Sequence, residues 1–140
     1  MSEAVREVPK KQRPEFRNIH VTELSNYRMP LASVVSILHR ISGFLIFLAL
    51  PLILYLLQMS ILSEDTFKHF AGIAALPLVK LIILALCWGY FQHFCAGVRH
   101  LFMDLHLGLD KDSARTSATA VLAVSLFLTF VTALKLFGVF

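Results

Sequence analysis

Three long apolar stretches constrain this chain more than any other feature of its sequence. They run over residues 31–59, 71–103 and 118–140. Each can supply the roughly 20 residues with which a helix crosses a ~30 Å hydrocarbon core. Only helices and closed barrels satisfy their backbone groups in lipid, and runs this continuous are not barrel strands. The sequence therefore predicts an all-α integral membrane protein with three transmembrane helices.

Composition supports lipid as the main solvent and divides the chain into two parts. Hydrophobic residues make up 57% of the sequence and charged residues 16%, with a mean hydropathy of +0.72, whereas a soluble domain carries about a quarter charged residues. We expect a polar tail over residues 1–30 and a transmembrane domain over residues 31–140. Met29-Pro30 favours extended backbone at their junction. Pro51 and Pro77 are expected to kink or distort helices, which a bundle tolerates.

The positive charges are distributed unevenly, which predicts an orientation. The connection after the first apolar stretch carries Lys68 alone, whereas the second connection carries Lys111 and Arg115. The tail holds most of the others: Arg6, Lys10, Lys11, Arg13, Arg17 and Arg28. Because Lys and Arg concentrate on the cytoplasmic side, we expect the N-terminus and the second connection inside, and the C-terminus outside. The net charge of +4 reflects this asymmetry, so we infer no nucleic-acid partner.

The tail also bears on which membrane holds the chain. It has no short apolar core followed by a small-residue cleavage site, as a secretory signal would have. A mitochondrial transit peptide is poor in acidic residues, but this tail contains Glu3, Glu7, Glu15 and Glu23. We therefore expect the bacterial inner (cytoplasmic) membrane rather than the mitochondrial inner membrane.

The second apolar stretch ends in a stripe of unusual residues, in the segment "HFCAGVRHLFMD". At 100° per residue, Gly97, His100 and Asp104 all fall within about 40° of His93 on one helix face, and Arg99 lies on a neighbouring face. Ionisable residues in a membrane segment are energetically costly and usually face a cavity, a partner or a cofactor. This stripe therefore does not fit a lipid-facing surface.

Gly97 lies one turn from His93 on the same face. Its missing side chain would allow something flat or bulky to lie against the helix, and a neutral imidazole beside that gap suits axial ligation of a haem iron. Close packing against another helix is the competing explanation, because small residues allow two backbones to approach.

The first helix opens with a second polar set, in "SILHRISG". Ser33, Ser36 and Arg40 share a face, with His39 beside them. In the predicted orientation this set lies at the same depth as the stripe of the second helix. Arg40 can hold a carboxylate in a two-pronged contact, and a hydroxyl such as Ser36 can bond a quinone carbonyl. Alternatively, Arg40 and Arg99 are interfacial side chains whose heads reach water. Two cysteines, at 87 and 95, are interpreted as packing residues too far apart for a disulfide.

The two segments resemble the larger of the two cytochrome b membrane anchors of succinate dehydrogenase (respiratory complex II). The resemblance covers the length and topology of the chain, and its specific parts are S-x-x-H-R-x-S and H-x-x-x-G-x-R-H-x-x-x-D. It implies a bundle formed together with a second membrane-anchor subunit. One departure is His106, just beyond the second motif, where a small residue is usual.

The resemblance implies a haem site. His93 aligns with the axial iron ligand of haem b, and the other ligand comes from the second anchor subunit. His39, Arg40 and His100 are similar to residues near the haem propionates.

The resemblance also implies a ubiquinone site, to which Ser36 and Arg40 would belong. Gly97, Arg99 and Asp104 are supporting positions of the second motif. In the family, electrons reach quinone from succinate through a flavoprotein subunit and an iron–sulfur subunit. This chain has no Gly-rich nucleotide loop and no cysteine cluster, so we expect it to be non-catalytic alone and to contribute only to the quinone site.

Two other functions compete with an electron-transfer subunit. One is a haem-free structural anchor of the same type of complex, which the presence of His93 and Gly97 disfavours. The other is a small ion or proton transporter that uses the intramembrane His and Arg. A transporter predicts polar residues at both ends of the bundle, whereas the outer halves of these stretches are almost wholly apolar.

Overall fold

The computed structural model describes residues 20, 22–23 and 26–139, and shows four helices in that part of the chain. These are α1 (Leu31–Leu62), α2 (Glu64–Ala74), α3 (Pro77–Asp104) and α4 (Lys111–Leu136). α1, α3 and α4 are each long and apolar enough to cross a membrane. The prediction of an all-helical chain with three such helices is therefore confirmed.

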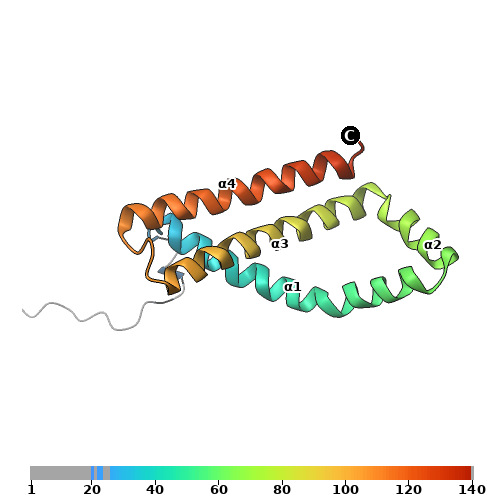
Figure 1. Cartoon of the computed structure of the whole chain (residues 1–140), viewed down its shortest axis with the longest axis horizontal. Helices are drawn as coiled ribbons and strands as arrows, with labels where there is room; N and C mark the ends of the chain where they lie inside the picture. Colours follow the sequence, from blue (N-terminus) through green and yellow to red (C-terminus); the bar gives the residue numbers. More distant parts are fainter. Residues whose placement is uncertain (1–19, 21, 24–25, 140) are drawn as a thin grey trace, which may run out of the picture.

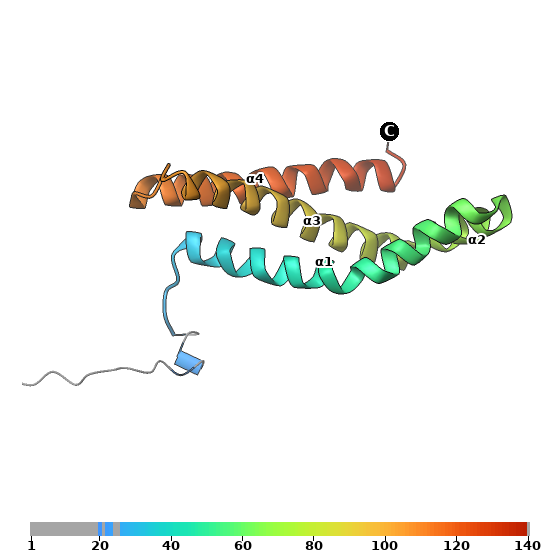
Figure 2. The same ribbon diagram turned by 60° about the horizontal axis from the view of Figure 1, so that its bottom comes forward.

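The ends of α1 follow from local chemistry. Pro30 has extended backbone, as its pairing with Met29 predicts, and precedes the first helical residue. The helix then runs without interruption through Pro51, although its ribbon bends near the middle (Figure 2). A proline inside a helix removes one backbone hydrogen bond and commonly bends the helix. At Ser63 the backbone returns to an extended conformation and α1 ends.

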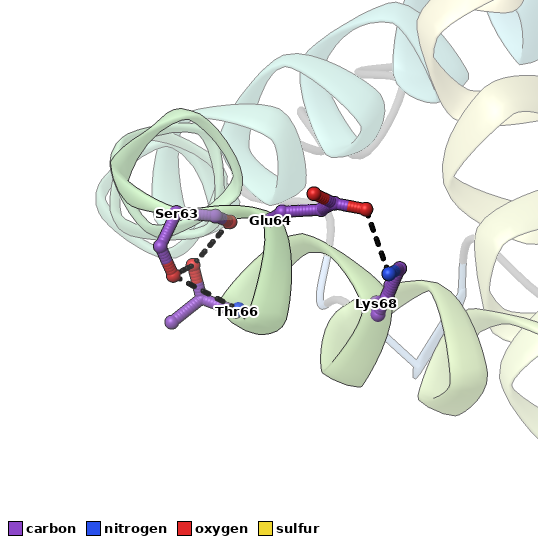
Figure 3. Close-up of polar contacts among 4 residues, drawn as sticks. All are labelled: Ser63, Glu64, Thr66 and Lys68. Carbon is purple, nitrogen blue, oxygen red and sulfur yellow. Dashed lines mark hydrogen bonds and ion pairs between the residues drawn. The ribbon is translucent and has the colours of Figure 1, made fainter.

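α2 occupies the segment that we interpreted as a simple connection. Ser63 caps it, because its hydroxyl accepts a hydrogen bond from the backbone N–H of Thr66 at 3.2 Å, as Figure 3 shows. Glu64 and Asp65 place negative charge in the first turn, where the helix dipole favours it. One turn later, Lys68 pairs with Glu64 at 2.7 Å on the exposed surface. The four residues 71–74 belong to α2, so the second long helix is shorter than we expected.

Pro77 does not kink a helix, contrary to our expectation. It occupies the first turn of α3, where a proline is tolerated because its missing N–H has no partner in the helix. α4 likewise begins earlier than the apolar stretch predicted, at Lys111 instead of residue 118. Asp110 caps it by accepting a hydrogen bond from the backbone N–H of Ser113 at 2.9 Å.

The three long helices alternate in direction, so the helix ends that carry polar residues lie together. The start of α1, the end of α3 and the start of α4 lie at one end of the molecule, while α2 and the C-terminus lie toward the other (Figure 1). α3 is central, since it contacts both α1 and α4 extensively. The buried apolar core is small, and consists of Val35, Ala96, Ala118 and Val121. Most large apolar side chains face outward, as expected of a protein surrounded by lipid.

α3 and α4 end in the same hydrogen-bonded motif with different residues. After α3, the N–H groups of His106 and Leu107 bond the carbonyls of Met103 and Phe102 at 2.9 and 3.1 Å. After α4, Gly138 and Val139 repeat the pattern. Both motifs need a left-handed residue, and the φ angles are 61° at His106 and 76° at Gly138. This conformation explains why a small residue suits position 106.

Candidate functional site

Three histidines from two helices form a cluster at the contact between α1 and α3. The imidazole of His39 on α1 stacks on that of His93 on α3, with ring centroids 4.3 Å apart and planes 16° from parallel. His100 lies on the other side, with its centroid 4.9 Å from that of His39. The sequence predicted that these residues share a depth, and the structure brings them into contact.

The His93 ring is held by the backbone of α1. Its Nδ1 lies 3.1 Å from the carbonyl oxygen of His39. A carbonyl can only accept a hydrogen bond, so in a neutral imidazole Nδ1 carries the proton and Nε2 keeps its lone pair. Metal-binding histidines commonly use this arrangement to fix the tautomer and the ring orientation. In this arrangement Nε2 of His93 makes no hydrogen bond among the described residues, so it is the ring nitrogen that could bind a metal.

A pair of glycines makes room for these rings. A Cβ added to Gly43 on α1 would lie 2.7 Å from Cε1 of His93, closer than side-chain atoms tolerate. A Cβ added to Gly97 on α3 would lie 3.6 Å from Nε2 of His39, an ordinary contact. Each glycine follows a histidine of its own helix by four residues, and each faces the histidine of the other helix. The flat group beside Gly97 is thus the imidazole of His39, and the glycine also allows the two helices to approach.

The other predicted residues surround the cluster without entering it. Arg40 and Asp104 are exposed, and Ser36 is half-buried. Within the described residues, the side chains of Ser36, Arg40 and Asp104 form no hydrogen bond or ion pair. These groups are therefore available to a ligand or to a neighbouring subunit.

Arg99 lies on the opposite side of α3. It is only 8% exposed, and its Nε donates a 2.9 Å hydrogen bond to the hydroxyl of Ser117 on α4. It therefore connects α3 to α4 and does not belong to the histidine cluster. Two turns deeper, buried Gln92 accepts a 2.9 Å hydrogen bond from Ser125 of α4 through its Oε1.

Sequence reasoning missed Gly43 and the partners on α4. The signal for Gly43 was present, because "HRISG" and "HFCAG" share the pattern H-x-x-x-G. Ser117 and Ser125 had no comparable signal, because serine occurs on many membrane helices without an interhelical partner. In the described part of the chain, no three His, Cys, Asp or Glu side chains are placed to share one metal ion.

Comparison with known proteins identifies the family. The sequence model of the succinate dehydrogenase/fumarate reductase transmembrane subunit matches residues 10–132. The succinate dehydrogenase cytochrome b556 subunit of Coxiella burnetii is 36% identical over 74% of this chain and 83% of its own length. The corresponding Paracoccus denitrificans protein is 32% identical over 81% and 88%, and the cytochrome b560 subunit of Marchantia polymorpha is 32% identical over 80% and 85%. The chain therefore belongs to the succinate dehydrogenase/fumarate reductase transmembrane subunits, as a multi-pass cytochrome b556 membrane anchor of succinate dehydrogenase.

Proposed function

We propose that this anchor binds one haem b, shared with the second anchor subunit, through Nε2 of His93. The observation that carries the proposal is the 3.1 Å contact between Nδ1 of His93 and the His39 carbonyl, because it leaves Nε2 as the free donor. The chemistry fits, since a neutral imidazole would be a suitable ligand for the haem iron. When bound, haem b supplies an iron that changes oxidation state by one electron.

The neighbouring hydrogen-bond donors would receive the haem propionates. His39 and His100 lie beside His93, and Arg40 follows His39 at the exposed edge of α1. Carboxylates pair best with such donors, and an arginine can hold one through two parallel hydrogen bonds. The proposed pocket thus combines one ligand histidine with a rim of hydrogen-bond donors.

The same edge of α1 would bind ubiquinone. Ser36 lies one helical turn before Arg40, on the same face. The Ser36 hydroxyl donates to a quinone carbonyl, and the Arg40 guanidinium stabilises the negative charge that grows on oxygen during reduction. Asp104, at the end of α3, is exposed at the same end of the molecule and would support the site by accepting a proton or a cation there.

The proposed orientation places this site beside the soluble subunits. The start of α1, the end of α3 and the start of α4 lie at one end of the molecule (Figure 1). The tail that precedes α1 in the sequence and the first turns of α4, with Lys111 and Arg115, contain most of the Lys and Arg residues. The positive-inside rule then puts this end in the cytoplasm, in a bacterial inner membrane. Electrons would arrive there from the flavoprotein through the iron–sulfur protein, and the bundle would be completed by the second anchor.

A difference absorbance spectrum, dithionite-reduced minus oxidised, tests the haem ligand. The complex is purified with its partner subunits, carrying the natural chain, His93→Leu or the control His69→Leu on α2. We expect a b-type signal in the natural and control complexes and none in His93→Leu. A signal that survives in His93→Leu would move the ligand to another histidine, with His100 examined first.

The same spectra decide the alternative function. A natural complex without any b-type signal would be a haem-free anchor, and the role of Arg40 would then depend on quinone alone. Quinone reduction is measured separately with Ser36→Ala and Arg40→Met. Both variants are expected to raise the KM for quinone and to leave electron transfer from succinate to a soluble dye unchanged.

A further inference from the structure

We propose that the groove between α3 and α4 binds an anionic phospholipid, with its phosphate at Arg99 and an acyl chain along the apolar wall. The groove has a volume of about 430 Å³ and is lined by residues of α3, α4 and their connection, with none from α1. The histidine cluster is therefore not part of it. Nothing in the proposed haem or quinone chemistry uses this groove.

The charge of Arg99 is the first argument. The side chain is 8% exposed, and within residues 20, 22–23 and 26–139 no carboxylate forms an ion pair with it. Its Nε is used by Ser117, while its two Nη groups make no hydrogen bond in that part of the chain. The chain does not enclose these Nη groups, and an unpaired charge in a membrane segment is energetically costly and usually faces a partner. We therefore infer that an anion outside the chain completes the contact.

The surrounding charges do not supply that anion. Asp110 and Asp112 lie at the start of α4, but they do not line the groove, and Asp110 is engaged in capping the helix. Lys111 and Arg115 on the same turns balance their charges. Among the residues that the structure describes, no carboxylate lines the groove beside Arg99.

The shape and depth of the groove favour a lipid over a carboxylate from another protein. Arg99 lies five residues before the end of α3, or about 8 Å by helical rise, within reach of the phosphate layer for a long side chain. Gly108 and Ser113 line the groove near the connection, while Phe94 and Val124 line its deeper part. The wall of the groove is almost wholly apolar, which suits an acyl chain, while Arg99, Ser113 and Ser117 supply the few polar groups that a head group would meet. Basic pockets between transmembrane helices on the cytoplasmic side are known to hold anionic lipid head groups.

Photo-crosslinking with a matched control tests the proposal. A benzophenone amino acid replaces Phe102, which lines the groove, or Leu101, its neighbour on α3 at similar depth outside it. These side chains are 54% and 65% exposed. The complete complex is reconstituted in vesicles of phosphatidylcholine with a minor fraction of phosphatidylglycerol, irradiated, and its lipid adducts are counted by mass spectrometry. An arginine paired with an anionic lipid favours its binding about fivefold. We therefore expect phosphatidylglycerol adducts to be enriched by that factor at position 102 and not at position 101.

Three variants separate charge from shape. Arg99→Gln is expected to reduce the enrichment at position 102 to the value at position 101, while Arg115→Gln, an exposed cation outside the groove, leaves it unchanged. Val124→Trp fills the groove and retains Arg99, so it keeps the test valid if Arg99→Gln does not assemble. We expect Val124→Trp to lower the yield of every lipid adduct at position 102. Equal lipid composition at positions 101 and 102, or an adduct to a partner subunit at position 102, would overturn the proposal.

Discussion

The two sides of α3 are built in different ways. Toward α1 the contact is made by aromatic rings and glycines, with His93 against Gly43 and His39 against Gly97. Toward α4 it is made by small residues and side-chain hydrogen bonds, including the one from Ser125 to Gln92. Both sides belong to the same helix in the same lipid environment. We therefore infer that the two contacts use different residues because they have different roles.

The α4 side has the contacts that hold membrane helices together, whereas the α1 side carries the histidines of the proposed haem site. In lipid, helices associate through close packing and interhelical hydrogen bonds because the hydrophobic effect does not drive them together. The α4 side satisfies this requirement with Ala96, Ala118 and Ser125, all fully buried. The α1 side instead stacks two imidazoles and leaves His93, His39 and His100 only half-buried. The exposed edges of these imidazoles are where we expect the proposed haem to bind.

The largest effect is expected from a single methyl group at the α1 contact. In Gly43→Ala the new Cβ would lie 2.7 Å from Cε1 of His93, so the ring must move, and we expect its hydrogen bond to the His39 carbonyl to be lost. Loss of such a supporting contact costs roughly 10- to 100-fold in metal affinity. We expect haem transfer from the complex to apomyoglobin to accelerate by a factor in that range.

Gly89→Ala is the matched control for that experiment. Gly89 also lies in a membrane helix, α3, but an added Cβ there has no neighbour within 4 Å. The transfer rate of this variant should equal that of the natural complex. Equal rates in Gly43→Ala and Gly89→Ala would show that the glycine on α1 does not position the ligand.

A smaller effect is expected on the α4 side. Ser125→Ala removes the hydroxyl that donates a hydrogen bond to Gln92. Gln92→Leu removes a buried amide whose Nε2 has no partner in the described part of the chain. Interhelical hydrogen bonds in membranes contribute about 0.6 kcal/mol on average and at most about 1.7. A double-mutant cycle on the unfolding free energy of the complex should therefore give a coupling in this range, with haem content unchanged. A coupling near zero would make the bond irrelevant to stability.

These two sides also show how far the sequence alone reaches. Hydropathy located α1, α3 and α4, because an apolar segment in lipid has one stable backbone conformation. Hydropathy missed α2, which begins at a local cap formed by Ser63. It also missed the first turns of α4, because they are polar. Helical periodicity placed His93 and Gly97 on one face, but pairing His93 with Gly43 required knowing how α1 and α3 are rotated. That rotation depends on packing over the whole contact.

The connection between α3 and α4 should gain stability from a simple change. His106 has a φ of 61°, a conformation that strains a residue with a Cβ and suits glycine. His106→Gly is expected to raise the unfolding free energy by up to about 1 kcal/mol. Gly138→Ala, at the equivalent position after α4, should lower it by a similar amount. The two variants are compared by chemical denaturation of the purified complex, and a shift of the same sign in both would contradict the shared motif.

The smallest effect concerns the cap of α4 and depends on pH. The hydrogen bond from the Ser113 backbone holds the pKa of the Asp110 carboxyl below its ordinary value of 3.8. A group with a lowered pKa in the folded protein stabilises it above the ordinary value, and that stabilisation is lost as the pH falls through the folded-state pKa. Hydrogen exchange of the Ser113 amide should therefore lose protection below about pH 4, while amides in the middle of α3 keep theirs. Asparagine caps helices as well as aspartate does and does not titrate, so Asp110→Asn should remove this pH dependence. Loss of protection at the same pH in Asp110→Asn would place the titrating group elsewhere on the α4 side of the molecule.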